Sequence, residues 1–154
     1  MRVDPTDVRI LTQLRRDSRI SNADLAEKVG LSASSCWRRV RGLEESGVIR
    51  RYSVVLDDER LDHGFQAIVH VQLTRHKPDE VEAFIKAVRA KPEVQDCYAT
   101  TGQTDYHLQV RCRDLTAYNR FLEDFLFRQT AVASAQTNVI LRKLKDRDDV
   151  GGQI

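Results

Sequence analysis

The stretch SNADLAEKVGLSASSCWRRVRGLEESG, residues 21–47, carries the signals of two consecutive helices joined by a short turn. Ser21 can accept hydrogen bonds from the open N–H groups of a helix that follows it, and Gly30 can adopt the left-handed conformation that ends that helix. Ser32 repeats the N-terminal signal and Gly47 the C-terminal one. Two helices with a turn of about three residues around a glycine are typical of a helix-turn-helix motif.

A further helix is predicted before this motif. Asp4 can cap it, and Pro5 suits its first position because the missing N–H of proline has no partner there in any case. Apolar residues then recur at helical spacing: Val8, Ile10, Leu11 and Leu14. Residues 1–50 are therefore predicted to form a three-helix, winged helix-turn-helix domain.

At 100° per residue, the helix predicted over 33–46 divides into a core side and an outer side. Cys36, Val40 and Leu43 fall together on the core side, while Trp37 and Arg39 flank its edges. Small hydroxyl residues permit close approach to a duplex, and guanidinium groups can reach guanine edges or phosphates. The alternative is an ordinary solvated basic face. The residues that we expect at DNA are Ser32, Ser34, Ser35, Arg38, Arg39 and Arg41, with Arg50 and Arg51 beyond the helix.

The charge distribution favours the DNA interpretation. The formal net charge of the 154 residues is only +2, but residues 1–56 hold 11 Lys and Arg against 7 Asp and Glu, whereas the remainder is slightly acidic. Positive charge confined to the first third fits a chain of which only that part meets a polyanion.

Other classes of protein are disfavoured. No apolar run approaches the roughly 20 residues of a membrane span, and the first residues do not resemble a secretory signal. The three cysteines, Cys36, Cys97 and Cys112, are widely spaced, so we expect buried free thiols and a cytoplasmic, nucleoid-associated protein. The sequence shows no metal-binding or catalytic constellation, so we expect no metal, no cofactor and no enzyme.

The rest of the chain predicts a second domain of different character. Residues 48–57 look extended, as a linking strand or a wing, and the linker between the domains is expected over 51–64. Residues 146–154 look like a flexible tail. Between them, over 65–145, the pattern predicts the ferredoxin-like βαββαβ arrangement, giving an α+β fold overall. The expected elements are strands over 66–73, 94–101, 105–112 and 134–144 and helices over 78–90 and 115–127.

The first and third of these strands would be the central pair of the sheet. Their apolar faces must lie under the helices, which leaves an open face that is polar but uncharged in its middle. Such a face suits a water-containing subunit interface, although a simply solvated face is the alternative. The expected dimer-interface residues are Ile68, His70, Gln72, His107 and Gln109.

The chain resembles the Lrp/AsnC family of bacterial and archaeal regulators over residues 3 to about 145. The resemblance is carried by RISNADLAEKVGLS (19–32), CWRRVRGLEESGVI (36–49), PEVQDCYATTG (92–102) and DYHLQV (105–110). It implies DNA binding by homodimers that assemble into larger rings, often of four dimers, and an amino acid or related metabolite held between subunits.

The resemblance also implies that the loop 101–105 takes part in the effector site. Asp105 could accept from an ammonium group, while the Thr101 hydroxyl and backbone N–H groups around Gly102 could bind a carboxylate. A simple hairpin turn is the alternative. The expected effector residues are Tyr98, Thr101, Gly102, Gln103, Asp105, Gln136 and Thr137.

This chain departs from the family pattern in three places. Gln103 replaces a usual acidic residue, Thr130-Ala131-Val132 replaces a frequent Pro-Gly turn, and the stretch 32–35 lacks a usual proline. Because Gln103 lacks the usual charge, a second hypothesis stays open: the chain could be an architectural nucleoid protein that binds no effector. A third hypothesis is that the chain is the amino-acid-sensing module of an enzyme. The helix-turn-helix argues against it, because such a module has no need of a basic three-helix domain.

Overall fold

The computed structural model describes residues 3–58, 60–74 and 77–144 of the chain. It consists of two compact units, and the boundary between them lies between Val55 and Leu56. This point lies inside the segment 51–64 that the sequence predicts to be a linker. The predicted tail, 146–154, lies outside the described residues.

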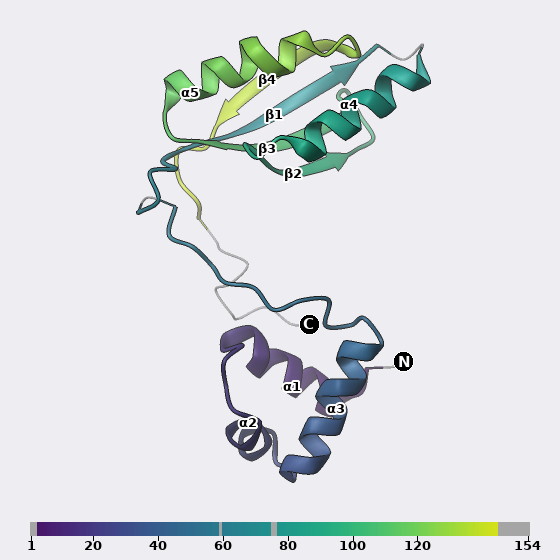
Figure 1. Ribbon diagram of the computed structural model, residues 1–154, viewed down its shortest axis with the longest axis vertical. Helices are drawn as coiled ribbons and strands as arrows, with labels where there is room; N and C mark the ends of the chain where they lie inside the picture. The colour runs from purple at the N-terminus through teal and green to yellow at the C-terminus, as the bar shows by residue number, and fades with distance from the viewer. Residues whose placement is uncertain (1–2, 59, 75–76, 145–154) are drawn as a thin grey trace. The chain divides into compact units, whose positions relative to one another are not determined.

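Three helices form the N-terminal unit: α1 (Pro5–Arg16), α2 (Asn22–Val29) and α3 (Ala33–Glu45) (Figure 1). The caps are those predicted. The Ser21 side chain accepts from the N–H of Asp24, and Gly30 ends α2 with a φ of 70°. The Ser32 side chain accepts from the N–H of Ser35 at the start of α3. These caps place α2 and α3 in the helix-turn-helix arrangement.

The three helices pack around a small core of their own. Ile10 from α1, Leu25 from α2 and Leu43 from α3 are each at most 2% exposed. Cys36 is fully buried among them, and this burial raises the pKa of its thiol. Cys36 therefore packs as a small apolar residue, as expected. Cys97 in the second unit is exposed, so the expectation of three buried thiols is wrong for that residue.

The strand or wing predicted after α3 is not formed. Within the described part of residues 48–64, no residue belongs to a strand. A lone extended segment has no neighbour to accept its backbone hydrogen bonds, and β-branched residues alone do not supply one.

The second unit is the predicted βαββαβ arrangement. Its strands are β1 (Phe65–Leu73), β2 (Val94–Ala99), β3 (Tyr106–Cys112) and β4 (Val132–Val139), in the antiparallel order β2-β3-β1-β4. The helices α4 (Pro78–Ala90) and α5 (Leu115–Arg120) lie on one face of this sheet (Figure 1). The strands β1 and β3 are thus the central pair, and within the described part of this unit no helix lies on the second face of the sheet.

The core of this unit lies between the sheet and the two helices. Alternate residues of the central strands, such as Val69 and Leu108, are fully buried, and Phe84 of α4 packs against them. The strand β4 is shorter than the predicted 134–144. The ladder with β1 ends at the pair of Ala67 and Val139, and the N–H of Ile140 adds one further bond to the carbonyl of Gln66 at 2.9 Å.

The helix predicted over 115–127 is regular only as far as Arg120. A π-helical turn, Phe121–Phe125, and a 3-10 turn, Leu126–Arg128, complete it. Phe121 and Leu126 are both buried although they lie five positions apart. In a regular α-helix this spacing would turn one of them away from the sheet, and the wider π-turn brings both to the core.

Candidate functional site

The outer side of α3 carries the exposed residues predicted to meet DNA. Ser34, Arg38 and Arg41 are exposed, whereas Cys36 and Leu43 hold the opposite side of the helix in the core. The Ser32 hydroxyl accepts the capping hydrogen bond from the N–H of Ser35, and it also lies 3.3 Å from the hydroxyl of Ser34. The structure therefore presents a helix whose first turn is small and hydroxyl-rich and whose next turns are basic.

Arg39 is directed elsewhere. Its Nη1 lies 2.7 Å from Oδ2 of Asp4 and 2.8 Å from Oδ1 of Asp7, both at the start of α1. The N–H of Asp7 and the Arg39 guanidinium lower the pKa of the Asp4 carboxyl below its usual value. The structure thus separates Arg39 from the other predicted DNA residues, because this side chain ties α3 to α1.

The charge of Arg41 is partly compensated within its own helix. Its Nη1 lies 4.0 Å from Oε2 of Glu44, and its Nε lies 3.8 Å from Oε1 of Glu45. Its guanidinium carbon also lies 5.8 Å from the centre of the Trp37 ring. Arg38 has no ion pair of this kind among the salt bridges of the described residues, so it is the more available arginine for an anionic partner.

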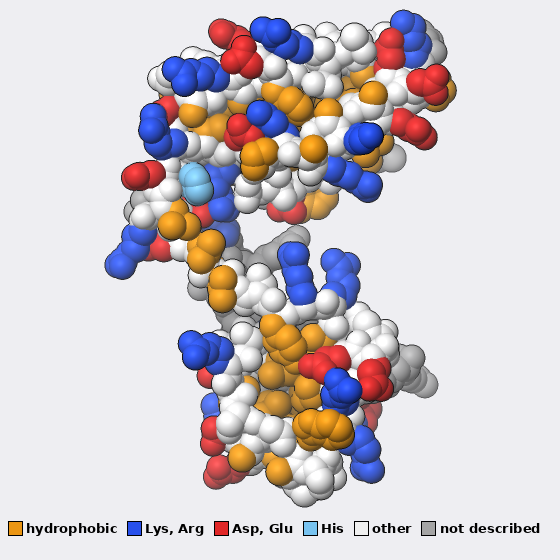
Figure 2. All heavy atoms as spheres, in the orientation of Figure 1, with side chains coloured by type: hydrophobic (Ala, Val, Ile, Leu, Met, Phe, Trp, Pro, Cys, Tyr) orange, Lys and Arg blue, Asp and Glu red, His pale blue; other side chains and the backbone are white. Residues whose placement is uncertain are grey.

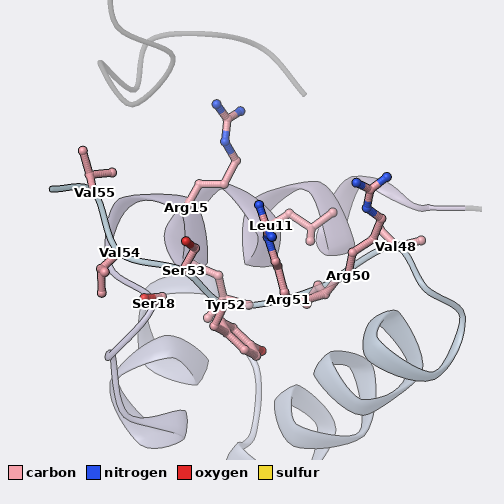
Figure 3. Close-up of a pocket in the computed structure, with 12 residues that line it drawn as sticks. Leu11, Arg15, Ser18, Val48, Arg50, Arg51, Tyr52, Ser53, Val54 and Val55 are labelled. Carbon is pink, nitrogen blue, oxygen red and sulfur yellow. The ribbon is translucent and has the colours of Figure 1, made fainter. Parts of the chain in front are cut away.

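The remaining predicted DNA residues, Arg50 and Arg51, lie on the segment after α3. With α1 this segment lines a hollow of mixed character, in which Leu11 and Val48 lie beside Arg15. Figure 2 shows hydrophobic side chains grouped on the N-terminal unit. In Figure 3 the guanidinium group of Arg50 points away from the side taken by the Tyr52 ring. Both arginines are exposed.

Tyr52 fixes this segment to α3. Its hydroxyl donates to Oε1 of Glu44 at 2.8 Å. Partial burial and the neighbouring Glu44 carboxylate raise the pKa of Tyr52 to about 12. The phenol therefore stays protonated at neutral pH and can serve as a donor there.

The open face of the sheet in the second unit carries the predicted interface residues. Ile68, near the centre of this face, is 38% exposed and lies opposite Gln109. His70 lies directly opposite His107. The two imidazoles form a hydrogen bond between their Nδ1 atoms at 2.6 Å. One of these nitrogens donates and the other accepts, so the bond links the two central strands on this face.

The loop after β2 holds Thr101, Gly102, Gln103 and Asp105. Gly102 has a φ of 127°, a conformation that favours glycine. Asp105 is bound to the central strand: its Oδ2 accepts from the N–H of Leu73 at 2.8 Å, and its own N–H donates to the carbonyl of Val71 at 3.0 Å. This carboxylate therefore ties the loop 101–105 to the end of β1.

The other predicted effector residues are not brought together. Tyr98 lies opposite His107 and Gln136 opposite His70, so both are on the open face. Thr137 is on the helix-covered face, where its hydroxyl lies 2.6 Å from that of Tyr118. Successive residues of a strand point to opposite faces, so Thr137 cannot line one surface with Gln136.

No set of three or more histidine, cysteine or acidic side chains among the described residues is arranged to hold a metal ion. Every helix described is too short or too polar to cross a bilayer.

Comparisons with known proteins define the class of each unit. Residues 3–50 match a family model described as winged helix-turn-helix DNA-binding, and residues 66–150 match the Lrp/AsnC ligand binding domain. A DNA-binding unit joined to a ligand-binding unit is the make-up of a transcriptional regulator. The chain belongs to the Lrp/AsnC family.

Relatives resemble the chain over nearly its whole length. The leucine-responsive regulatory protein of Haemophilus influenzae is 40% identical over 93% of this chain and 86% of its own, and that of Escherichia coli K12 is 38% identical over 93% and 87%. A solved transcriptional regulator from Neisseria meningitidis, in complex with L-methionine, is 39% identical, covers 94% of both chains and has a TM-score of 0.91. Another, an AsnC family regulator from Agrobacterium tumefaciens, is 33% identical with a TM-score of 0.88 and covers 93% of both chains.

Proposed function

We propose that this regulator binds duplex DNA by laying the outer side of α3 in the major groove, and that an amino acid held near the loop 101–105 modulates this binding. The observation that carries the proposal is the division of α3 into a buried side and an exposed side that bears Ser34 and Arg38. A helix supported in this way is the part of a helix-turn-helix domain that reads base edges.

The chemistry of the exposed side fits this role. Ser34 is small enough to let the helix approach the bases closely, and Arg38 has five N–H donors that suit the O6 and N7 acceptors of guanine. Arg50 and Arg51 extend the positive charge beyond the helix and suit phosphates. Because Arg39 already binds two carboxylates, we assign it to the support of α3 rather than to DNA.

The effector proposal rests on the loop and on the relatives. The solved regulator from Neisseria meningitidis is a complex with L-methionine. A feast or famine regulatory protein of Mycobacterium tuberculosis is likewise described as complexed with L-methionine, and it is 28% identical to this chain with a TM-score of 0.85. An α-ammonium group needs an anionic acceptor, and Asp105 is the acidic residue of the loop 101–105 here. The partners that we propose are therefore DNA, a small amino acid and further copies of the chain at the nucleoid.

The test of the DNA interface uses the full chain and duplexes that it selects from a random pool. Arg38→Ala should weaken binding by about 1–3 kcal/mol, with the loss concentrated at one base position. The matched control is Arg120→Ala, which makes the same charge change on α5 and should leave binding close to that of the wild type. Equal losses in the two variants would mean that only overall charge matters.

The test of the effector site is a thermal-shift screen of the full chain with the twenty amino acids. A ligand at 100 times its Kd adds about 2.7 kcal/mol of stability, which is readily seen. If no amino acid shifts the transition and selected duplexes bind hardly better than random ones, the architectural hypothesis replaces the sensing one.

A further inference from the structure

Trp37 is a large apolar residue that lies outside the hydrophobic core of the N-terminal unit. The indole-bearing residue is 58% exposed, although the core of its unit is closed by Ile10, Leu43 and Cys36, all fully buried. Trp37 follows Cys36 directly, so the turn of the helix carries it out of the core. It is also the only tryptophan in the chain.

The neighbours of Trp37 on α3 are the residues of the proposed DNA side. Ser34 precedes it by three positions and Arg41 follows it by four, which places all three in one row along the helix. Arg38 is the next residue in the chain and is likewise exposed. Any duplex that reaches Ser34 and Arg41 must therefore also meet the indole.

The indole is held in place before any partner arrives. The guanidinium carbon of Arg41 lies 5.8 Å from the ring centre, within the range of a cation–π contact, and Glu44 and Glu45 lie beside this guanidinium. A ring braced by such a contact loses less conformational freedom on binding than a free one, and 58% of the residue is still exposed.

From this placement we infer that Trp37 is a specificity-determining residue that packs against the 5-methyl group of a thymine in the major groove. The ring has a single N–H donor and no acceptor, so it cannot form the paired hydrogen bonds that distinguish adenine or guanine. An apolar contact with thymine is the form of base recognition left to it. The inference rests on the proposed function, since it requires that α3 enters the groove.

The test uses the full chain and a short duplex that it selects from a random pool. Each thymine of one half-site is replaced in turn by deoxyuridine, which lacks only the methyl group. For the wild type, removal of the contacted methyl should weaken binding about three- to fivefold, the loss expected for one buried methyl group. Replacement of the other thymines should have little effect.

The protein side of the test is Trp37→Ala. This variant should bind the selected duplex at least about tenfold more weakly, and the deoxyuridine penalty at the sensitive position should disappear. Trp37→Phe should keep part of the penalty because it keeps a flat apolar ring. Phe127→Ala, which removes an equally exposed aromatic ring (58%) from the second unit, should keep both affinity and penalty.

The outcomes separate this inference from the function on which it rests. Tight binding by the wild type with no deoxyuridine penalty, or a penalty of the same size in Trp37→Ala, overturns the thymine contact and leaves the DNA interface standing. Unchanged DNA binding with a smaller assembled mass in Trp37→Ala also overturns it, because the indole would then be covered by another copy. A selection that enriches no duplex overturns the proposed interface itself.

Discussion

Arg39 on α3 and Asp7 on α1 form an ion pair in which the acid is buried and the base is not. Nη1 of Arg39 lies 2.8 Å from Oδ1 of Asp7, whose side chain is 2% exposed, while that of Arg39 is 35% exposed. The helix proposed to read DNA is therefore held at one edge by a charge on a different helix. Its orientation relative to α1 depends on this ion pair.

Loss of the Asp7 carboxylate should loosen the N-terminal unit. In Asp7→Ala, the charge-assisted bond from Arg39 and the bond from the N–H of Asp4 (3.1 Å) both disappear, which should cost about 1.5–3 kcal/mol. Hydrogen exchange of the α1 amides measures this free energy for the unit by itself. The control is Glu27→Ala, at an exposed acid on α2, which should change the free energy by less than about 0.5 kcal/mol.

Acid should weaken the same junction, and the direction follows from the pKa of Asp4. The N–H of Asp7 and the Arg39 guanidinium lower this pKa in the folded chain below the ordinary value of 3.8. A carboxyl with a lowered folded pKa stabilises the fold above its unfolded value, and this contribution is lost as the pH falls through the folded pKa.

Stability of the N-terminal unit should therefore fall as the pH drops below 3.8, and in Asp4→Asn this fall should be shallower. Asparagine remains a good N-cap, so the variant should fold at neutral pH. Denaturant unfolding at a series of pH values measures the slope. An identical slope in wild type and variant would show that other carboxyls account for the acid sensitivity.

Asp105→Asn should separate the two roles open to this residue. Asparagine keeps an oxygen that can accept from the N–H of Leu73, so the sheet end should stay intact, whereas the negative charge that would bind an ammonium group is lost. We expect basal DNA binding to persist and the amino-acid response to disappear, as measured by calorimetry and mobility shift in parallel.

Asp105→Ala is the comparison, because it leaves the Leu73 N–H without this acceptor and should also lower the melting temperature. If Asp105→Asn binds amino acids as tightly as the wild type does, the carboxylate serves the hairpin alone.

The open sheet face should join two copies of the chain. Ile68→Arg places a charge at the centre of this face, where burial against a second copy would leave it unpaired, and should therefore shift the protein towards a monomer of 17.7 kDa. Light scattering at micromolar concentration measures the mass. Leu115→Arg, at a residue of 57% exposure on α5, should keep the mass of the wild type, and a monomeric wild type would contradict the prediction.

Much of the fold could be predicted from local signals. Ser21, Gly30 and Ser32 act only on backbone groups within a few residues, so their effect is visible in the sequence itself. The alternation along the central strands likewise predicted which face of the sheet the helices cover. The prediction of a strand after α3 was wrong because a strand needs a neighbouring strand to pair with. The sequence of the segment cannot show whether such a neighbour exists.

The site was harder to predict because its decisive contacts join distant parts of the chain. Helical geometry places Arg39 at the edge of the apolar stripe but cannot show that Asp4 and Asp7 lie opposite it. In the same way, nothing near Asp105 indicates that its carboxylate reaches Leu73 across the sheet. Gln136 and Thr137 lie on opposite faces of β4, a separation that follows from the alternation of a strand and is therefore visible in the sequence.

The place of Trp37 also makes the two units spectroscopically distinct. All five phenylalanines and three of the four tyrosines belong to the unit Leu56–Lys143, whereas the single indole belongs to the other. Selective tryptophan excitation therefore monitors the helix-turn-helix unit without any label, while tyrosine absorption reports mainly on the second unit. Stopped-flow mixing of one unmodified sample can thus establish whether a signal from the sensing unit precedes or follows the response at the DNA.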